Sequence, residues 1–169
     1  MRSTFFPRLV NGPFGDPALY VRIAHRGEAL LFDCGDLRPL TARELLKIRV
    51  VFISHGHIDH LIGFDSLLRQ FLYQDRELVV CGPPGLCDLI AARLGGYSWN
   101  LLEGFPLRLS VREWGTPCGR SATFRAGEGF RPPPFLAWPC PDDLLFDAGH
   151  WQVRARPLDH GGLISLAFS

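Results

Sequence analysis

The 169-residue sequence lacks any apolar run close to the roughly 18 to 20 residues that a membrane-spanning helix requires. Residues 1–16 contain neither a sustained apolar stretch nor a small-residue cleavage site, so no signal peptide is predicted. The five cysteines are an odd number without a C-x-x-C pair, which is not typical of a secreted disulfide framework. We therefore expect reduced thiols, a cytoplasmic location and no membrane partner.

Lysine is nearly absent, because Lys47 is the single lysine among 18 basic residues. Since 17 acidic residues bring the formal charge to +1, the composition predicts no general attraction to nucleic acid or to an anionic membrane. Apolar residues make up 47% and charged residues 21%, which is typical of a globular protein and argues against intrinsic disorder. The length predicts one domain over residues 1–169.

Strand-like and helix-like segments alternate, which is typical of an α/β protein. Residues 49–53 are apolar and β-branched, as a buried strand should be. Residues 41–44 match a capping box and predict a short helix to about Lys47. Apolar residues at three- and four-residue steps predict a second helix over 60–73. The other expected elements are a helix at 86–94 and strands at 18–24, 29–32, 78–81, 107–114, 144–146, 151–155 and 163–168.

The segment 54–60, Ser-His-Gly-His-Ile-Asp-His, contains an H-x-H-x-D-H motif directly after the predicted strand 49–53. Alternate residues of an extended backbone project the same way, so His55 and His57 can converge on one ion. The following helix would deliver Asp59 and His60 from another direction, suited to a second ion. Imidazole with carboxylate suits zinc, with iron, manganese or cobalt possible on affinity grounds. The alternative is a polar loop of hydrogen-bonded histidines.

This motif resembles the signature of the metallo-β-lactamase fold superfamily, which implies an αββα sandwich and, in most members, a two-metal hydrolase. Residues 32–36, Phe-Asp-Cys-Gly-Asp, are similar to the upstream strand-end motif of the same fold. The resemblance implies that Asp33 supports the metal-binding loop without contacting the ion; a turn-forming aspartate is the alternative. It also implies that Asp59 orients the attacking water and accepts its proton, as the catalytic residue.

A third segment, Pro157-Leu158-Asp159-His160-Gly161-Gly162 before the strand 163–168, is similar to the ribonuclease Z branch, whose members trim the 3′ trailer of precursor tRNA. The resemblance assigns His160 to the first metal beside His55 and His57. The remaining histidines, His25 and His150, stand in other contexts and are expected to be surface or packing residues.

The sequence departs from the family pattern near its C-terminus. The family needs a bridging aspartate and a last histidine downstream of the His160 equivalent, and only nine residues follow His160. We therefore expect the first half of the αββα sandwich, a mixed sheet with flanking helices, in an apparently truncated chain. The first zinc site would be well formed by three histidines. The second, with only Asp59 and His60, would be incomplete; Mn²⁺ or Fe²⁺ could replace zinc.

Three hypotheses for function follow. The first is a ribonuclease Z-like hydrolase that cleaves the phosphodiester of precursor tRNA with a metal-activated water. The second is another hydrolase of the same superfamily that acts on a small phosphodiester. The third is an incomplete, non-catalytic chain that folds partially, or only by pairing with a complementary half, and exposes apolar surface where a second sheet should pack. A homodimer is a further expectation.

Overall fold

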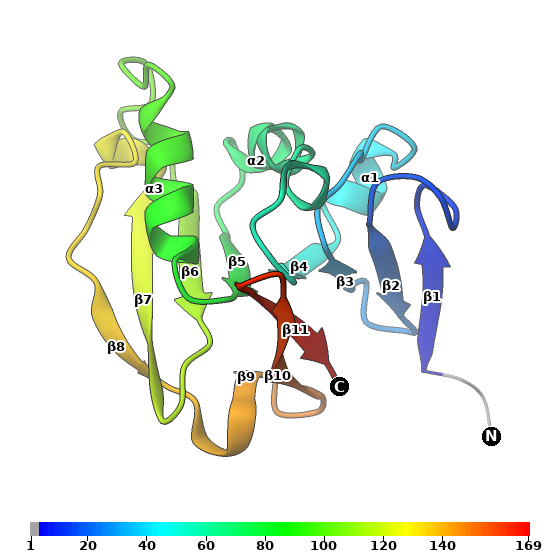
Figure 1. Ribbon diagram of the computed structural model, residues 1–169. Helices are drawn as coiled ribbons and strands as arrows, with labels where there is room; N and C mark the ends of the chain where they lie inside the picture. Colours follow the sequence, from blue (N-terminus) through cyan, green and yellow to red (C-terminus); the bar gives the residue numbers. More distant parts are fainter. Residues whose placement is uncertain (1–3) are drawn as a thin grey trace.

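A computed structural model describes residues 4–169 (Figure 1). Eight strands form one mixed sheet, and their order across the sheet is their order in the sequence. Neighbouring strands from β3 to β6 are parallel, whereas the outer pairs are antiparallel. The strands are β1 (Phe5–Leu9), β2 (Leu19–Ile23), β3 (Ala29–Phe32), β4 (Ile48–Phe52), β5 (Glu77–Gly82), β6 (Arg108–Glu113), β7 (Cys118–Arg125) and β8 (Leu136–Pro139).

Three helices connect the central strands, as the parallel pairing requires. They are α1 (Ala42–Leu45), α2 (Phe64–Phe71) and α3 (Leu86–Gly95). The predicted capping box of α1 is confirmed: the backbone N–H of Glu44 donates to the Thr41 hydroxyl, and the Glu44 carboxylate accepts from the Thr41 backbone N–H. Within the described residues, no helix has the length and apolarity needed to cross a membrane.

A second, three-stranded antiparallel sheet lies at the lower centre of Figure 1, below β4 and β5 and on the side away from α2. It consists of β9 (Leu144–Asp147), β10 (Gln152–His160) and β11 (Leu163–Phe168), with β10 in the centre. The backbone N–H of Leu166 donates to the carbonyl of Ser54 at 2.9 Å, so β11 is joined directly to the segment that follows β4.

The large sheet buries apolar side chains on both faces. Alternate residues of a strand point to opposite faces, and in β4 the side chain of Val51 packs under the helices while Val50 and Phe52 pack against the small sheet. The Phe52 ring meets that of Phe146 edge-on at 6.2 Å and lies 5.7 Å from that of Phe168. The layers are therefore helices, large sheet and small sheet, which confirms the predicted α/β fold with a mixed sheet and flanking helices.

The expected helix over 60–73 is wrong at its start. A short 3₁₀ turn covers Ile58–His60, and α2 begins only at Phe64. A continuous helix would need the His60 carbonyl as an acceptor for the Phe64 N–H. That carbonyl instead accepts from the Cys34 N–H at 2.8 Å, and the Gly63 N–H donates back to the Cys34 carbonyl at 2.9 Å.

Three strands, β1, β7 and β8, were not predicted, and β10 is longer than the expected 151–155. The second half of β10 is exposed and polar, so its hydropathy carries no strand signal. Backbone pairing with β11 from Ala155 to His160 holds it extended.

A buried carboxylate stabilises the start of α3, which has no capping side chain of its own. Oε1 of Glu113 accepts the backbone N–H groups of Gly85 (3.1 Å) and Cys87 (2.8 Å). Arg120 donates to Oε2 at 2.8 Å and also reaches Asp88. The Glu113 carboxylate thus accepts hydrogen bonds from the N-terminus of α3 and also balances the positive charge of the Arg120 guanidinium.

We expect Glu113→Ala to lower the free energy of unfolding by about 2–3 kcal/mol, because the variant leaves two backbone donors without partners. Urea denaturation measures the change. Asp88→Ala is the matched control: its side chain is 63% exposed, so losing its ion pair with Arg120 should cost under about 1 kcal/mol. Equal losses in both variants would contradict this role for Glu113.

Candidate metal centre

Three histidines from two distant parts of the chain meet at one point. His55 and His57 lie on the loop after β4, and His160 lies at the end of β10. One ring nitrogen of each lies within 4.8 Å of those of the other two. Nε2 of His55 and Nδ1 of His57 are 3.0 Å apart, close to the edge of about 3.3 Å expected for a tetrahedral zinc with Zn–N bonds of ~2.0–2.1 Å. The donor set and its spacing therefore fit a divalent metal ion.

Two serines orient the ring of His55. The Ser54 hydroxyl donates to Asp33 at 2.9 Å, so its oxygen is free to accept from Nδ1 of His55, 3.0 Å away. The Ser165 hydroxyl of β11 lies 3.4 Å from the same nitrogen. With the proton on Nδ1, Nε2 presents its lone pair toward His57. The sequence motif includes Ser54 but assigns it no role, and Ser165 carries no local signal because only folding brings it to His55.

The imidazole of His55 is only 6% exposed. Burial lowers its pKa below the ordinary value, and the neighbouring rings of His60, His57 and His160 lower that pKa further. A lowered pKa keeps the ring neutral near pH 7, and a neutral imidazole is the form that binds a metal ion.

Asp33 connects the β3 end to this loop. Oδ1 accepts the Ser54 backbone N–H at 2.7 Å, and Oδ2 lies 3.0 Å from Nδ1 of His60. This contact turns Nε2 of His60 outward, where it lies 3.6 Å from Oδ2 of Asp59. The Asp59 carboxylate is 48% exposed, whereas the His60 ring is 13% exposed. Asp59 and His60 therefore form a second donor pair beside the three histidines, and the rings of His55 and His60 lie 3.9 Å apart.

The chain segments beneath this centre approach one another closely. A Cβ on Gly63 would lie 2.1 Å from the Gly35 carbonyl oxygen, and a Cβ on Gly35 would lie 2.8 Å from the Asp59 carbonyl oxygen. Only glycine permits this backbone contact. The contact sets the position of the 3₁₀ turn that carries Asp59 and His60.

The two histidines expected to be surface or packing residues lie elsewhere in the fold. His25 is exposed in the β2–β3 turn, and His150 is exposed with Nδ1 3.0 Å from the Ala148 carbonyl oxygen.

Asp33 does adopt a positive φ of 58° after its strand, so it is a turn residue as well as a partner of the metal-binding loop.

Residues 30–126 match the family model for the beta-lactamase superfamily domain. The chain belongs to this superfamily. The fold implies the use of a divalent metal ion, and the histidine cluster lies where the loop after β4 meets the small sheet. The predicted relationship to the metallo-β-lactamase fold and its ribonuclease Z branch is confirmed.

Ribonuclease Z of Deinococcus radiodurans is 32% identical over 159 residues, which cover 91% of this chain and 48% of that protein. Ribonuclease Z of Geobacillus kaustophilus is 36% identical over 145 residues, covering 82% of this chain and 38% of that protein. The crystal structure of human tRNase Z, short form, superposes with a TM-score of 0.53 at 22% identity, covering 98% of this chain and 61% of that one, and supports the fold. The chain spans about half the length, or less, of these curated relatives.

Substituting Gly63 tests the close contact beneath the centre. We expect Gly63→Ala to lower the free energy of unfolding by about 1–3 kcal/mol or more, because the added Cβ meets backbone atoms that cannot move independently. Gly95→Ala is the control: its Cβ would meet nothing within 4 Å, and a helix favours alanine. Thermal denaturation of both variants measures the difference. A Gly63→Ala protein as stable as Gly95→Ala would contradict the contact.

Proposed function

We propose that this chain carries the metal-binding part of a ribonuclease Z-type phosphodiesterase that cleaves precursor tRNA. The observation that carries the proposal is the convergence of His55, His57 and His160 in a chain with ribonuclease Z relatives. A phosphodiester is anionic, so a centre that becomes cationic when it holds a metal ion suits it as a substrate.

In this proposal, His55, His57 and His160 would hold a zinc ion. Bound there, zinc would act as a Lewis acid and lower the pKa of water toward neutral pH. Ser54 and Ser165 hold the Nδ1 side of His55, and Asp33 holds His60.

The proposed catalytic residue is Asp59. Its carboxylate is half-exposed, and one oxygen lies 3.6 Å from Nε2 of His60. An exposed carboxylate at this position can orient an incoming water and accept its proton. Asp59 and His60 are two ligands, fewer than the four that zinc usually takes, so a second ion should bind much more weakly than the first. The same hypothesis allows Mn²⁺ or Fe²⁺ to occupy the site in place of zinc.

A cytoplasmic location is part of the proposal. Four of the five thiols are buried, and all five are unpaired, which suits a reducing compartment. Burial raises the pKa of Cys87 to about 12 and that of Cys81 to about 12, so both thiols stay protonated and unreactive. Assembly as a homodimer stays a prediction.

Metal stoichiometry tests the proposed ligands. We expect one tightly bound zinc per chain, measured by isothermal titration calorimetry against a competing chelator. His160→Ala should weaken binding by at least about tenfold, since it removes one of three ligands. His150→Ala, a change of the same type outside the cluster, should leave affinity unchanged. Two tight zinc ions per chain, or equal affinities of the two variants, would contradict the proposed ligand set.

The substrate is tested by comparing precursor tRNA with bis-p-nitrophenyl phosphate. We expect the zinc-loaded chain to cleave precursor tRNA at the 3′ trailer, and Asp59→Asn to reduce kcat by about 10²–10⁴-fold, the usual contribution of a general base. Cleavage of the small diester alone would favour the small-molecule hydrolase instead. Tight zinc binding without any cleavage would favour the non-catalytic hypothesis.

A further inference from the structure

An uncharged hollow adjoins the histidine cluster. It has a volume of about 530 Å³, within the usual range of small-molecule sites. The loop before α3 forms one wall with Pro83 and Pro84, and β11 forms another with Leu163 and Ile164. His57, one of the three clustered histidines, lines the same space. The hollow and the candidate metal centre therefore share His57.

The chemistry of the lining differs from that of the centre. None of the ten described residues that line the hollow is Lys, Arg, Asp or Glu. Leu89 of α3 lines the hollow beside Gly56. A Cβ added to Gly56 would lie 3.1 Å from Cδ1 of Leu89. A side chain at position 56 would therefore crowd Leu89 at the edge of this space.

The start of α3 does not offer the hollow an anion site, although Gly85 lines it. The Gly85 N–H and the Cys87 N–H both donate to Glu113, and the Leu86 N–H donates to the Pro83 carbonyl at 3.2 Å. A phosphate would be attracted to the metal-loaded centre and not to these occupied donors. The hollow is suited to a part of the ligand that is uncharged and apolar on its faces.

We propose that the hollow is the subsite for a nucleobase next to the phosphate at the metal centre. This inference rests on the proposed phosphodiesterase function. A nucleotide combines an anionic phosphate with a flat, uncharged ring, which matches a cationic centre beside an apolar hollow. The flat ring would lie between the Pro83–Pro84 wall and the Leu163–Ile164 wall, while the phosphate remains on the side of His57 and His160. Leu163 and Ile164 are then residues that determine affinity for the base.

Binding of two small probes to the zinc-loaded chain tests the subsite without measuring activity. The probes are adenosine 5′-monophosphate and ribose 5-phosphate, which share the phosphate and sugar and differ in the base. We expect the adenosine compound to bind at least about fivefold more tightly, because placing the base in the hollow removes apolar surface from water. Titration calorimetry or NMR shift titration measures both affinities.

Leu163→Gln and Ile164→Gln should remove this preference and leave ribose 5-phosphate binding unchanged. Both side chains are partly exposed, at 38% and 41%, so the variants should fold. Leu158→Gln is the matched control: Leu158 is 55% exposed on the neighbouring strand, does not line the hollow, and should keep the preference.

The remaining outcomes distinguish failure of the base subsite from failure of the proposed phosphodiesterase function. Equal affinity of the wild-type chain for the two probes would overturn the base subsite and leave phosphate binding at the metal centre intact. A preference that survives both glutamine variants would overturn the subsite as well. If the zinc-loaded chain bound neither probe, the proposed phosphodiesterase function would fail, and the subsite with it.

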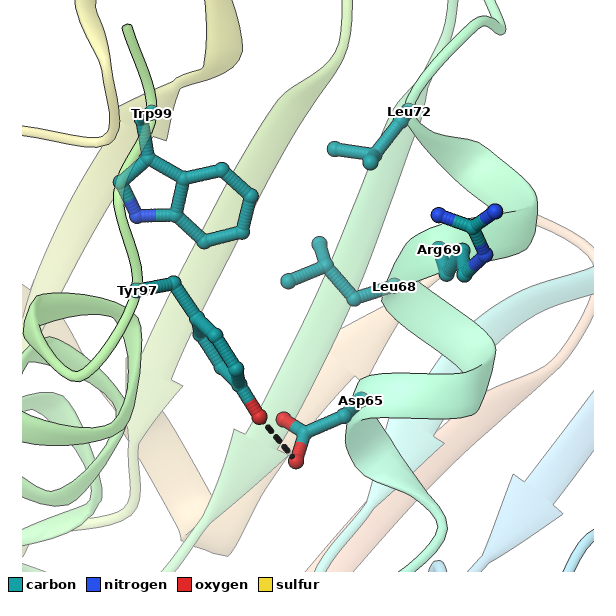
Figure 2. A pocket seen from close by; sticks show the side chains of 6 residues that line it. All are labelled: Asp65, Leu68, Arg69, Leu72, Tyr97 and Trp99. Carbon is teal, nitrogen blue, oxygen red and sulfur yellow. Dashed lines mark hydrogen bonds between the residues drawn. The ribbon is translucent and has the colours of Figure 1, made fainter.

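A second hollow, of about 220 Å³, lies between α2 and the segment after α3 and shares no residue with the first. Figure 2 shows Tyr97 donating from its hydroxyl to Oδ2 of Asp65, at 2.8 Å, across this space. Arg93 pairs with the same carboxylate at 2.9 Å. The Asp65 carboxylate therefore holds α2 against the end of α3, which is a structural role.

Discussion

The centre depends on the carboxylate of Asp33. It accepts the backbone N–H and the hydroxyl of Ser54 and lies against Nδ1 of His60, so one side chain after β3 positions the whole loop after β4. Through the Ser54 hydroxyl, the same interaction reaches Nδ1 of His55. Both rings are thereby held with Nε2 pointing outward, one toward the three-histidine cluster and one toward Asp59. A carboxylate hydrogen-bonded around metal-binding imidazoles fixes the orientation of their rings.

Two features of the topology make this interaction possible. Because β3 and β4 are parallel neighbours, their carboxyl ends reach the same edge of the sheet, which places Asp33 beside Ser54. The small sheet then crosses the other face, where Phe52 packs against Phe146 and Phe168. This packing and the Leu166–Ser54 hydrogen bond bring His160 to the centre. The same β10–β11 hairpin supplies one wall of the uncharged hollow.

The elements that were predicted correctly carry their signal in local sequence. The capping box of α1 and the apolar run of β4 are examples, since each depends on contacts within a few residues. The error at the start of α2 has a non-local cause: the Cys34 N–H donates to the His60 carbonyl, which the first turn of a helix over 60–73 would have used as an acceptor. The exposed half of β10 is likewise extended because of its partner strand.

The sequence alone determined the donor types and their local spacing: histidines two residues apart after an apolar strand, followed by Asp59 and His60, and a third candidate ligand in His160. The spacing of His55 and His57 follows from the short-range geometry of one extended segment, whereas His160 was implied by the resemblance to the ribonuclease Z branch. The tertiary structure alone decided that His160 meets His55 across about a hundred residues of chain, that Ser165 contacts the same ring, and that an uncharged hollow adjoins them. Such contacts arise from the packing of two sheets, because residues far apart in sequence become neighbours only when their shared apolar surface is buried.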